Sequence, residues 1–140
     1  MKGNKIKGFK GCYRLFLDVC GNSEEFVVTK HFEHKAYKVE DCFSLYVLRD
    51  LVYNSIVIVN RPRNLSILLK NNLRKAIYLY NKRRDLVFVL EEDTISGEYR
   101  IFKTIYKGSE SMWVNDWMNQ NQKDTRIKFK DYFKNNTLEV

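Results

Sequence analysis

Three strand patterns follow one another closely between residues 76 and 106, and they constrain the fold more than any other feature of the chain. Residues 76–80 alternate aliphatic and tyrosine side chains, which is typical of a strand with one buried face. Residues 86–90 form an unbroken apolar run, which is typical of a central strand buried on both faces. The link 82–85 is short enough for a hairpin. Because residues 98–106 alternate again after a turn, we expect an antiparallel sheet here.

The N-terminal part of the chain predicts two further strands. Residues 12–19 alternate polar and apolar side chains, and residues 21–23 have the composition of a turn. Residues 26–29 then form a short, largely β-branched strand. This second strand leads directly into the segment that contains both histidines of the chain.

Helical patterns complete the predicted secondary structure. From about residue 39, apolar side chains recur at the spacing of an amphipathic helix. The β-branched run 55–59 favours a strand after that helix. Residues 60–64 break the chain before a short helix over 65–73, and a last helix is expected over 111–118.

These patterns predict a single α+β domain over residues 1–140, in which an antiparallel sheet of four or more strands packs against helices on one face. Residues 109–140 form a basic and aromatic C-terminal extension of that domain. Alternation along the last strand predicts two faces, Tyr99, Ile101 and Ile105 on one, and Arg100, Phe102, Thr104 and Tyr106 on the other.

The net charge of +8 indicates an anionic partner, most often nucleic acid or an anionic membrane. No acidic residue lies between Asp50 and Asp85, so the positive charge is concentrated. A solvated basic surface without a partner is the alternative. The candidate nucleic-acid-binding residues are Lys30, Lys35, Arg61, Arg63, Arg74, Lys75, Lys82, Arg83 and Arg84.

The three cysteines do not form a metal or disulfide pattern of a familiar kind, because no CxxC pair is present. Reduced thiols in the cytoplasm are therefore expected, with delivery by a phage or a dedicated secretion system left open. No apolar run reaches the length of a membrane span, so no membrane partner is expected. A zinc site of His31, His34 and Cys42 is an alternative to the expectation of no metal and no cofactor.

The two histidines lie three residues apart and are flanked by lysines, in the segment Lys30 to Lys35. Histidine is the side chain that exchanges protons near neutral pH. Cleavage of RNA without metal needs one group that removes the proton of the 2′-hydroxyl, another that protonates the leaving oxygen, and cations for the phosphorane. This segment and the polar face of the last strand supply such groups. Ordinary surface histidines and ordinary strand residues are the alternatives.

The order of these elements resembles the phage-encoded branch of the barnase–EndoU–colicin–RelE-like nucleases. The resemblance covers about residues 26–108 and rests on the Lys-His-x-x-His segment after a strand, the tyrosine-rich strand and the ending Thr104-Ile105-Tyr106. It implies a toxin-like endoribonuclease that leaves a 2′,3′-cyclic phosphate and a 5′-hydroxyl. His34 would be the general acid or base with His31 second. Lys30, Lys35 and Arg100 would neutralise the phosphate, and Thr104 and Tyr106 would position it.

The chain also departs from this family. It has no third histidine, and residues 109–140 extend beyond the family pattern. Two other classes of protein therefore remain as hypotheses. One is a nucleic-acid-binding protein of a phage or mobile element that does not cleave. The other is a basic interaction or inhibitor module that docks on an acidic protein, and for a toxin a cognate inhibitor protein is a further expected partner.

Overall fold

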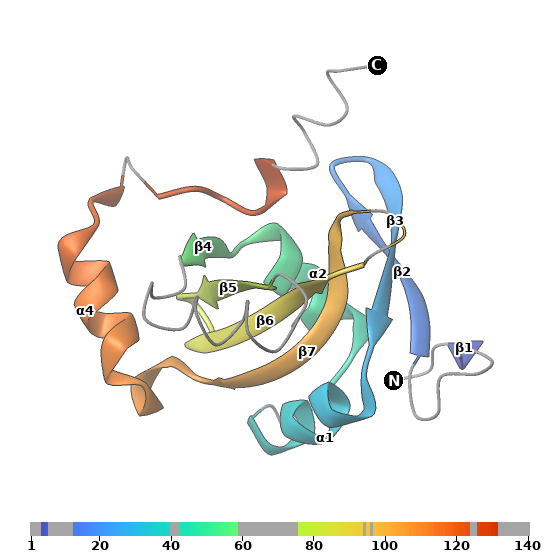
Figure 1. Cartoon of the computed structure of the whole chain (residues 1–140), viewed down its shortest axis with the longest axis horizontal. Coiled ribbons are helices and arrows are strands. Elements are labelled where there is room, and N and C mark those ends of the chain that lie inside the picture. Colours follow the sequence, from blue (N-terminus) through green and yellow to red (C-terminus); the bar gives the residue numbers. More distant parts are fainter. Residues whose placement is uncertain are drawn as a thin grey trace.

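A computed structural model describes residues 4–5, 13–39, 43–58, 76–93, 95, 97–123 and 126–131. The described strands form one seven-stranded sheet in the order β1-β2-β3-β7-β6-β5-β4 (Figure 1). All neighbouring strands are antiparallel except β3 and β7, which are parallel. The strands are β1 (Asn4–Lys5), β2 (Tyr13–Val19), β3 (Asn22–Val28), β4 (Ile56–Ile58), β5 (Ala76–Asn81), β6 (Leu86–Glu92) and β7 (Tyr99–Lys107).

Three α-helices are described, and with the sheet they confirm the predicted α+β class. They are α1 (Lys30–Val39), α2 (Leu45–Tyr53) and α4 (Met112–Gln120), the last preceded by the 3-10 turn η2 (Gly108–Glu110). The last helix agrees with the helix predicted over 111–118. None of the described helices has the length and apolar character needed to cross a membrane.

The amphipathic helix predicted from about residue 39 corresponds to α2, which begins at Leu45, whereas α1 was not predicted. Thr29 caps α1, since its hydroxyl accepts a hydrogen bond from the backbone amide of Phe32 at 3.1 Å. Ser44 caps α2 in the same way by accepting from the amide of Val47. The histidine segment is therefore the first turns of a helix. The predicted helix over 65–73 lies outside the described residues.

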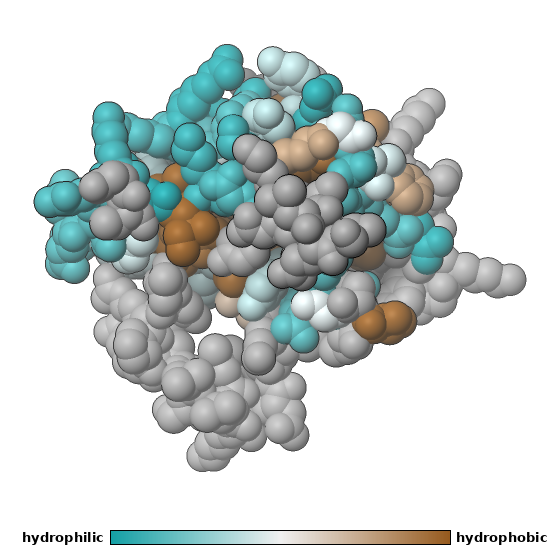
Figure 2. Space-filling view, turned by 90° about the horizontal axis from the view of Figure 1, so that it is seen from above, coloured by the Kyte–Doolittle hydropathy of each residue, from teal (hydrophilic) through white to brown (hydrophobic). Residues whose placement is uncertain are grey.

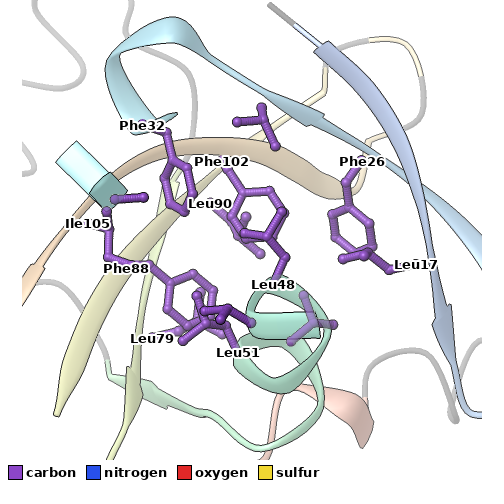
Figure 3. Packing of buried hydrophobic residues seen from close by; sticks show 14 of the residues in the cluster. Leu17, Phe26, Phe32, Leu48, Leu51, Leu79, Phe88, Leu90, Phe102 and Ile105 are labelled. Atoms are coloured by element: carbon purple, nitrogen blue, oxygen red, sulfur yellow. The ribbon is translucent and has the colours of Figure 1, made fainter. Parts of the chain in front are cut away.

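The main core lies on the face of the sheet that α1 and α2 cover. Phenylalanine rings from three elements meet there, and the ring centroid of Phe102 lies 4.9 Å from that of Phe32 and 5.5 Å from that of Phe26 (Figure 3). Leu48 and Leu51 of α2 are fully buried in the same cluster. Burial of this apolar surface is the main force that holds the two helices on the sheet.

A second, smaller cluster lies on the opposite face, so the prediction of helices on one face is wrong. The fully buried Val114 of α4 packs there with Val87 of β6 and Ile58 of β4. We call this side of the sheet the α4 face. The predicted central strand 86–90 is confirmed, since all five residues are buried and the strand contributes to both clusters.

A β-bulge in β7 overturns the predicted faces of that strand. Val89 of β6 pairs with Thr104, but the next residue, Leu90, pairs with Phe102, so Lys103 is an extra residue in the ladder. The extra residue brings Phe102 and Ile105 into the same core cluster, whereas alternation had put them on opposite faces. Thr104 and Tyr106 still share a face, as expected.

The first hairpin has a shorter turn than the predicted 21–23, and its second strand begins four residues before the predicted strand 26–29. The turn consists of Cys20 and Gly21, with φ angles of 53° and 83°, and Asn22 already belongs to β3. Positive φ at both central residues is the requirement of the two-residue hairpin turn that matches strand twist. Hydrophilic residues dominate the described surface in Figure 2, where hydrophobic side chains form small separate patches.

Candidate functional site

His31 of α1 and Thr104 of β7 are brought together by the fold. The imidazole Nε2 of His31 lies 3.3 Å from the hydroxyl oxygen of Thr104, although the two residues are 73 positions apart. His31 is exposed and Thr104 is half-buried. The contact therefore lies at a surface open to solvent. It joins the imidazole of His31, a group that can exchange protons near neutral pH, to the hydroxyl of Thr104.

The parallel pair of β3 and β7 is what positions this contact. Val28, the last residue of β3, pairs with Phe102 of β7. The next residue, Thr29, donates a hydrogen bond from its hydroxyl to the carbonyl oxygen of Phe102 at 3.0 Å. Because β3 ends there, α1 lies along the remaining residues of β7 (Figure 1). Phe32 and Ala36 anchor α1 in the core, which leaves His31 at the side of the helix that faces Thr104.

One side of α1 carries a row of basic side chains. His34, Lys35 and Lys38 follow His31 by three, four and seven residues, which are the spacings that share a helix face. We call His31, His34, Lys35 and Lys38 the basic flank. Lys30, His34 and Lys38 are exposed and Lys35 is half-buried. Lys30 precedes His34 by four residues, so it lies next to His34 at the start of α1. Lys38 was not predicted, although helical spacing counted from His31 would have revealed it.

The α4 face continues from Thr104 across the sheet as two rows of side chains. The strand register aligns Thr104, Val89, Tyr78 and Ile58 in one row. It aligns Tyr106, Val87, Tyr80 and Ile56 in the next row.

Tyr106 belongs to this face and has a shifted pKa. Burial raises its pKa, the neighbouring Tyr78 raises it further, and side-chain hydrogen bonds with Trp113 and Ser111 partly offset the rise. Tyr106 therefore stays protonated at neutral pH. Its hydroxyl is held by α4 and the segment before it, and Trp113 also meets the Tyr78 ring edge-on at 5.7 Å.

Arg100 does not join this group of residues. Its guanidinium forms ion pairs with Glu24, at 2.8 Å, and with Glu98, and it lies 5.3 Å from the centre of the Phe26 ring. It is 8% exposed. The bulge at Lys103 puts Arg100 and Thr104 on different faces, so the predicted grouping of these two residues is wrong. These contacts favour a structural role for Arg100 in joining β3 to β7.

Two arginines of the acid-free stretch are paired with the acidic residue just before it. Arg84 donates from Nε to Asp50 at 2.6 Å, and Arg83 lies 3.9 Å from the same carboxylate. Lys82 is exposed in the β5–β6 turn. The positive charge of Arg83 and Arg84 is thus partly compensated by Asp50. Only the fold reveals this pairing. Arg61, Arg63, Arg74 and Lys75 lie outside the described residues.

The alternative of a zinc site formed by His31, His34 and Cys42 also cannot be placed completely, because Cys42 lies outside the described residues. Among the residues that are described, no three His, Cys, Asp or Glu side chains gather closely enough to hold a metal ion. The exposed Cys20 has a free thiol.

No protein-family model, curated protein or solved structure matches this chain.

Proposed function

We propose that the protein is a metal-independent endoribonuclease in which His31 transfers a proton. The observation that carries this proposal is the 3.3 Å contact between His31 Nε2 and the Thr104 hydroxyl, at the edge of a surface bearing His34, Lys35 and Lys38. The structure thus favours His31 as the principal proton-transfer residue, where sequence patterns favoured His34.

The chemistry follows from the groups on this surface. The 2′-hydroxyl of RNA attacks the adjacent phosphorus, the bond to the 5′-oxygen breaks, and the products are a 2′,3′-cyclic phosphate and a 5′-hydroxyl. Thr104 contacts Nε2 of His31, so Nδ1 is the ring nitrogen left to exchange a proton with the substrate. His34, one turn along the same flank, supplies the second proton transfer, and the ammonium groups of Lys35 and Lys38 stabilise the negative phosphorane.

Incubation of a defined RNA with the protein in EDTA, followed by analysis of the new end groups, tests this proposal. His31→Ala should reduce the rate by roughly 10²–10⁴-fold, because one proton transfer is lost. Glu33→Gln, on the other side of α1, is the matched control and should retain the wild-type rate. Cleavage that survives the His31/His34 double alanine variant would refute the assignment.

Binding of nucleic acid without cleavage is the second candidate function. It is favoured by the position of Arg100, because the arginine expected to stabilise the phosphorane is instead paired with Glu24 and Glu98. In that case the wild-type protein binds RNA but leaves it intact. Lys35→Gln and Lys38→Gln should then weaken binding and lower the dependence of affinity on salt, since fewer counterions are released.

A further inference from the structure

A hollow of about 330 Å³ lies between α2 and the β2–β3 hairpin, away from the basic flank. Its volume is within the range of small-molecule sites, about 300–1,000 Å³. From α2 come Tyr46, Arg49 and Tyr53, which recur at the spacing of one helix face. From the hairpin come Asp18 and Cys20.

The wall formed by α2 combines aromatic rings with positive charge. Tyr46 is 69% exposed, and the guanidinium of Arg84 lies 5.9 Å from the centre of its ring. The ammonium group of Lys130 lies 4.7 Å from the centre of the Tyr53 ring. Arg49 lies between the two tyrosines along the helix and has no ion-pair partner within the described residues.

The carboxylates of the hollow are not equivalent. Asp50 is committed to the fold, because its oxygens accept hydrogen bonds from Arg84 at 2.6 Å and from Asn54 at 2.6 Å. Asp18, on the hairpin, is exposed and has no ion-pair partner among the described residues. Within the described residues, the hollow therefore offers a carboxylate and a guanidinium without ion-pair partners, and an exposed aromatic ring.

The hairpin wall is a tight turn. Cys20 and Gly21 have φ angles of 53° and 83°, as the two-residue hairpin requires. Here the tight turn holds Asp18 and the thiol of Cys20 against α2.

We propose that this hollow binds a nucleoside monophosphate. The base would stack on the exposed Tyr46 ring, as bases do on aromatic side chains. The phosphate would pair with Arg49, whose planar fork of donors suits phosphate oxygens. Asp18 would accept hydrogen bonds from the ribose hydroxyls, a pairing that carboxylates make in nucleotide sites. Lys130, beside Tyr53, adds positive charge nearby. The same chemistry is offered by a free nucleotide and by the phosphorylated end of an RNA strand.

Isothermal titration of the full chain with AMP, adenosine and inorganic phosphate tests this site. AMP should bind with saturation and more tightly than either of its parts. Arg49→Gln should weaken AMP roughly tenfold, because it removes a charge-assisted hydrogen bond, while changing adenosine less than about twofold. Tyr46→Ala should weaken both AMP and adenosine, because both stack their base.

Two matched controls locate the site. Tyr37→Ala removes another exposed tyrosine, on α1, and Lys123→Gln removes an exposed charge after α4, so both should leave AMP affinity unchanged. Absence of saturable AMP binding up to about 10 mM would overturn the proposal. Weakening by Lys38→Gln instead of Arg49→Gln would overturn it too, since it would place the nucleotide at the proposed ribonuclease site. Comparing short RNAs with and without a terminal phosphate then separates the two sources of ligand.

Discussion

Thr29 and Phe102 join the beginning of α1 to the middle of β7. The hydroxyl of Thr29 donates to the carbonyl oxygen of Phe102 at 3.0 Å, and the amide of Thr29 bonds to the same oxygen at 3.3 Å. That hydroxyl also accepts from the amide of Phe32 as the cap of α1. One side chain therefore sets both where the helix begins and where His31 lies relative to Thr104.

Thr29→Val should destabilise the protein by about 1–2 kcal/mol, because valine keeps the shape but cannot cap the helix. It should also lower RNA cleavage by the folded protein, since His31 is positioned through Thr29. Denaturant unfolding and the cleavage rate measure the two effects. Thr104→Val is the control, since Thr104 caps no helix and should change stability less. Equal stability of the Thr29→Val variant and the wild type would contradict the capping role.

Gly108→Ala should destabilise the fold by about 1–3 kcal/mol, because the site is already filled. A Cβ at Gly108 would lie 2.5 Å from Asp85 Oδ1 and 2.5 Å from Cε1 of Tyr80. Tyr80 donates a hydrogen bond to that carboxylate oxygen, so neither group can move away freely. The measurement is the free energy of unfolding in urea. Ser109→Ala should have a much smaller effect, because it keeps the hydrogen bond that the backbone amide of residue 109 donates to the Asp85 carboxylate.

The contribution of Asp50 to the free energy of unfolding should be lost in acid. Burial by itself raises the pKa of Asp50, but hydrogen bonds from Arg84 and Asn54 and the charges of Arg84 and Arg83 outweigh it, and the pKa is lowered from 3.8. A lowered pKa in the folded state means that the stabilisation is fully present above the unfolded value. It is lost as the pH falls below about 4, through the pKa of the folded state.

The comparison of wild type with Asp50→Asn isolates this contribution. The wild type should be more stable than the variant at pH 7, and the difference should shrink as the pH is lowered from 5 to 2. Urea unfolding at each pH measures it. A difference independent of pH would show that the charge of Asp50 does not stabilise the fold.

Arg100→Gln should lower the free energy of unfolding by about 1–3 kcal/mol, because it leaves Glu24 and Glu98 without their cation. If Arg100 is structural, RNA cleavage per folded molecule should not change. The two quantities are measured by denaturant unfolding and by the cleavage rate at saturating substrate. A loss of rate with unchanged stability would instead restore Arg100 to the catalytic group.

Several elements could be predicted from local patterns alone. The apolar run 86–90 identified a strand buried on both faces, because a sequence without polar residues can lie only where both faces are covered. The alternation in residues 12–19 identified β2, and the pattern over 111–118 identified α4. The clustering of both histidines with lysines in residues 30–35 is also visible in the sequence, although the helix that carries them was not predicted.

The candidate site itself depended on tertiary structure. His31 meets Thr104 only because β3 and β7 pair in parallel and α1 starts at Thr29, and no local pattern encodes a pairing across 73 residues. The bulge at Lys103 is also a property of two strands together, because the extra residue is defined against β6. Likewise Arg84 is paired with the carboxylate of Asp50, 34 residues away, which no pattern in its basic neighbours indicates. Composition and periodicity determined which elements form, whereas long-range pairing decided which side chains meet.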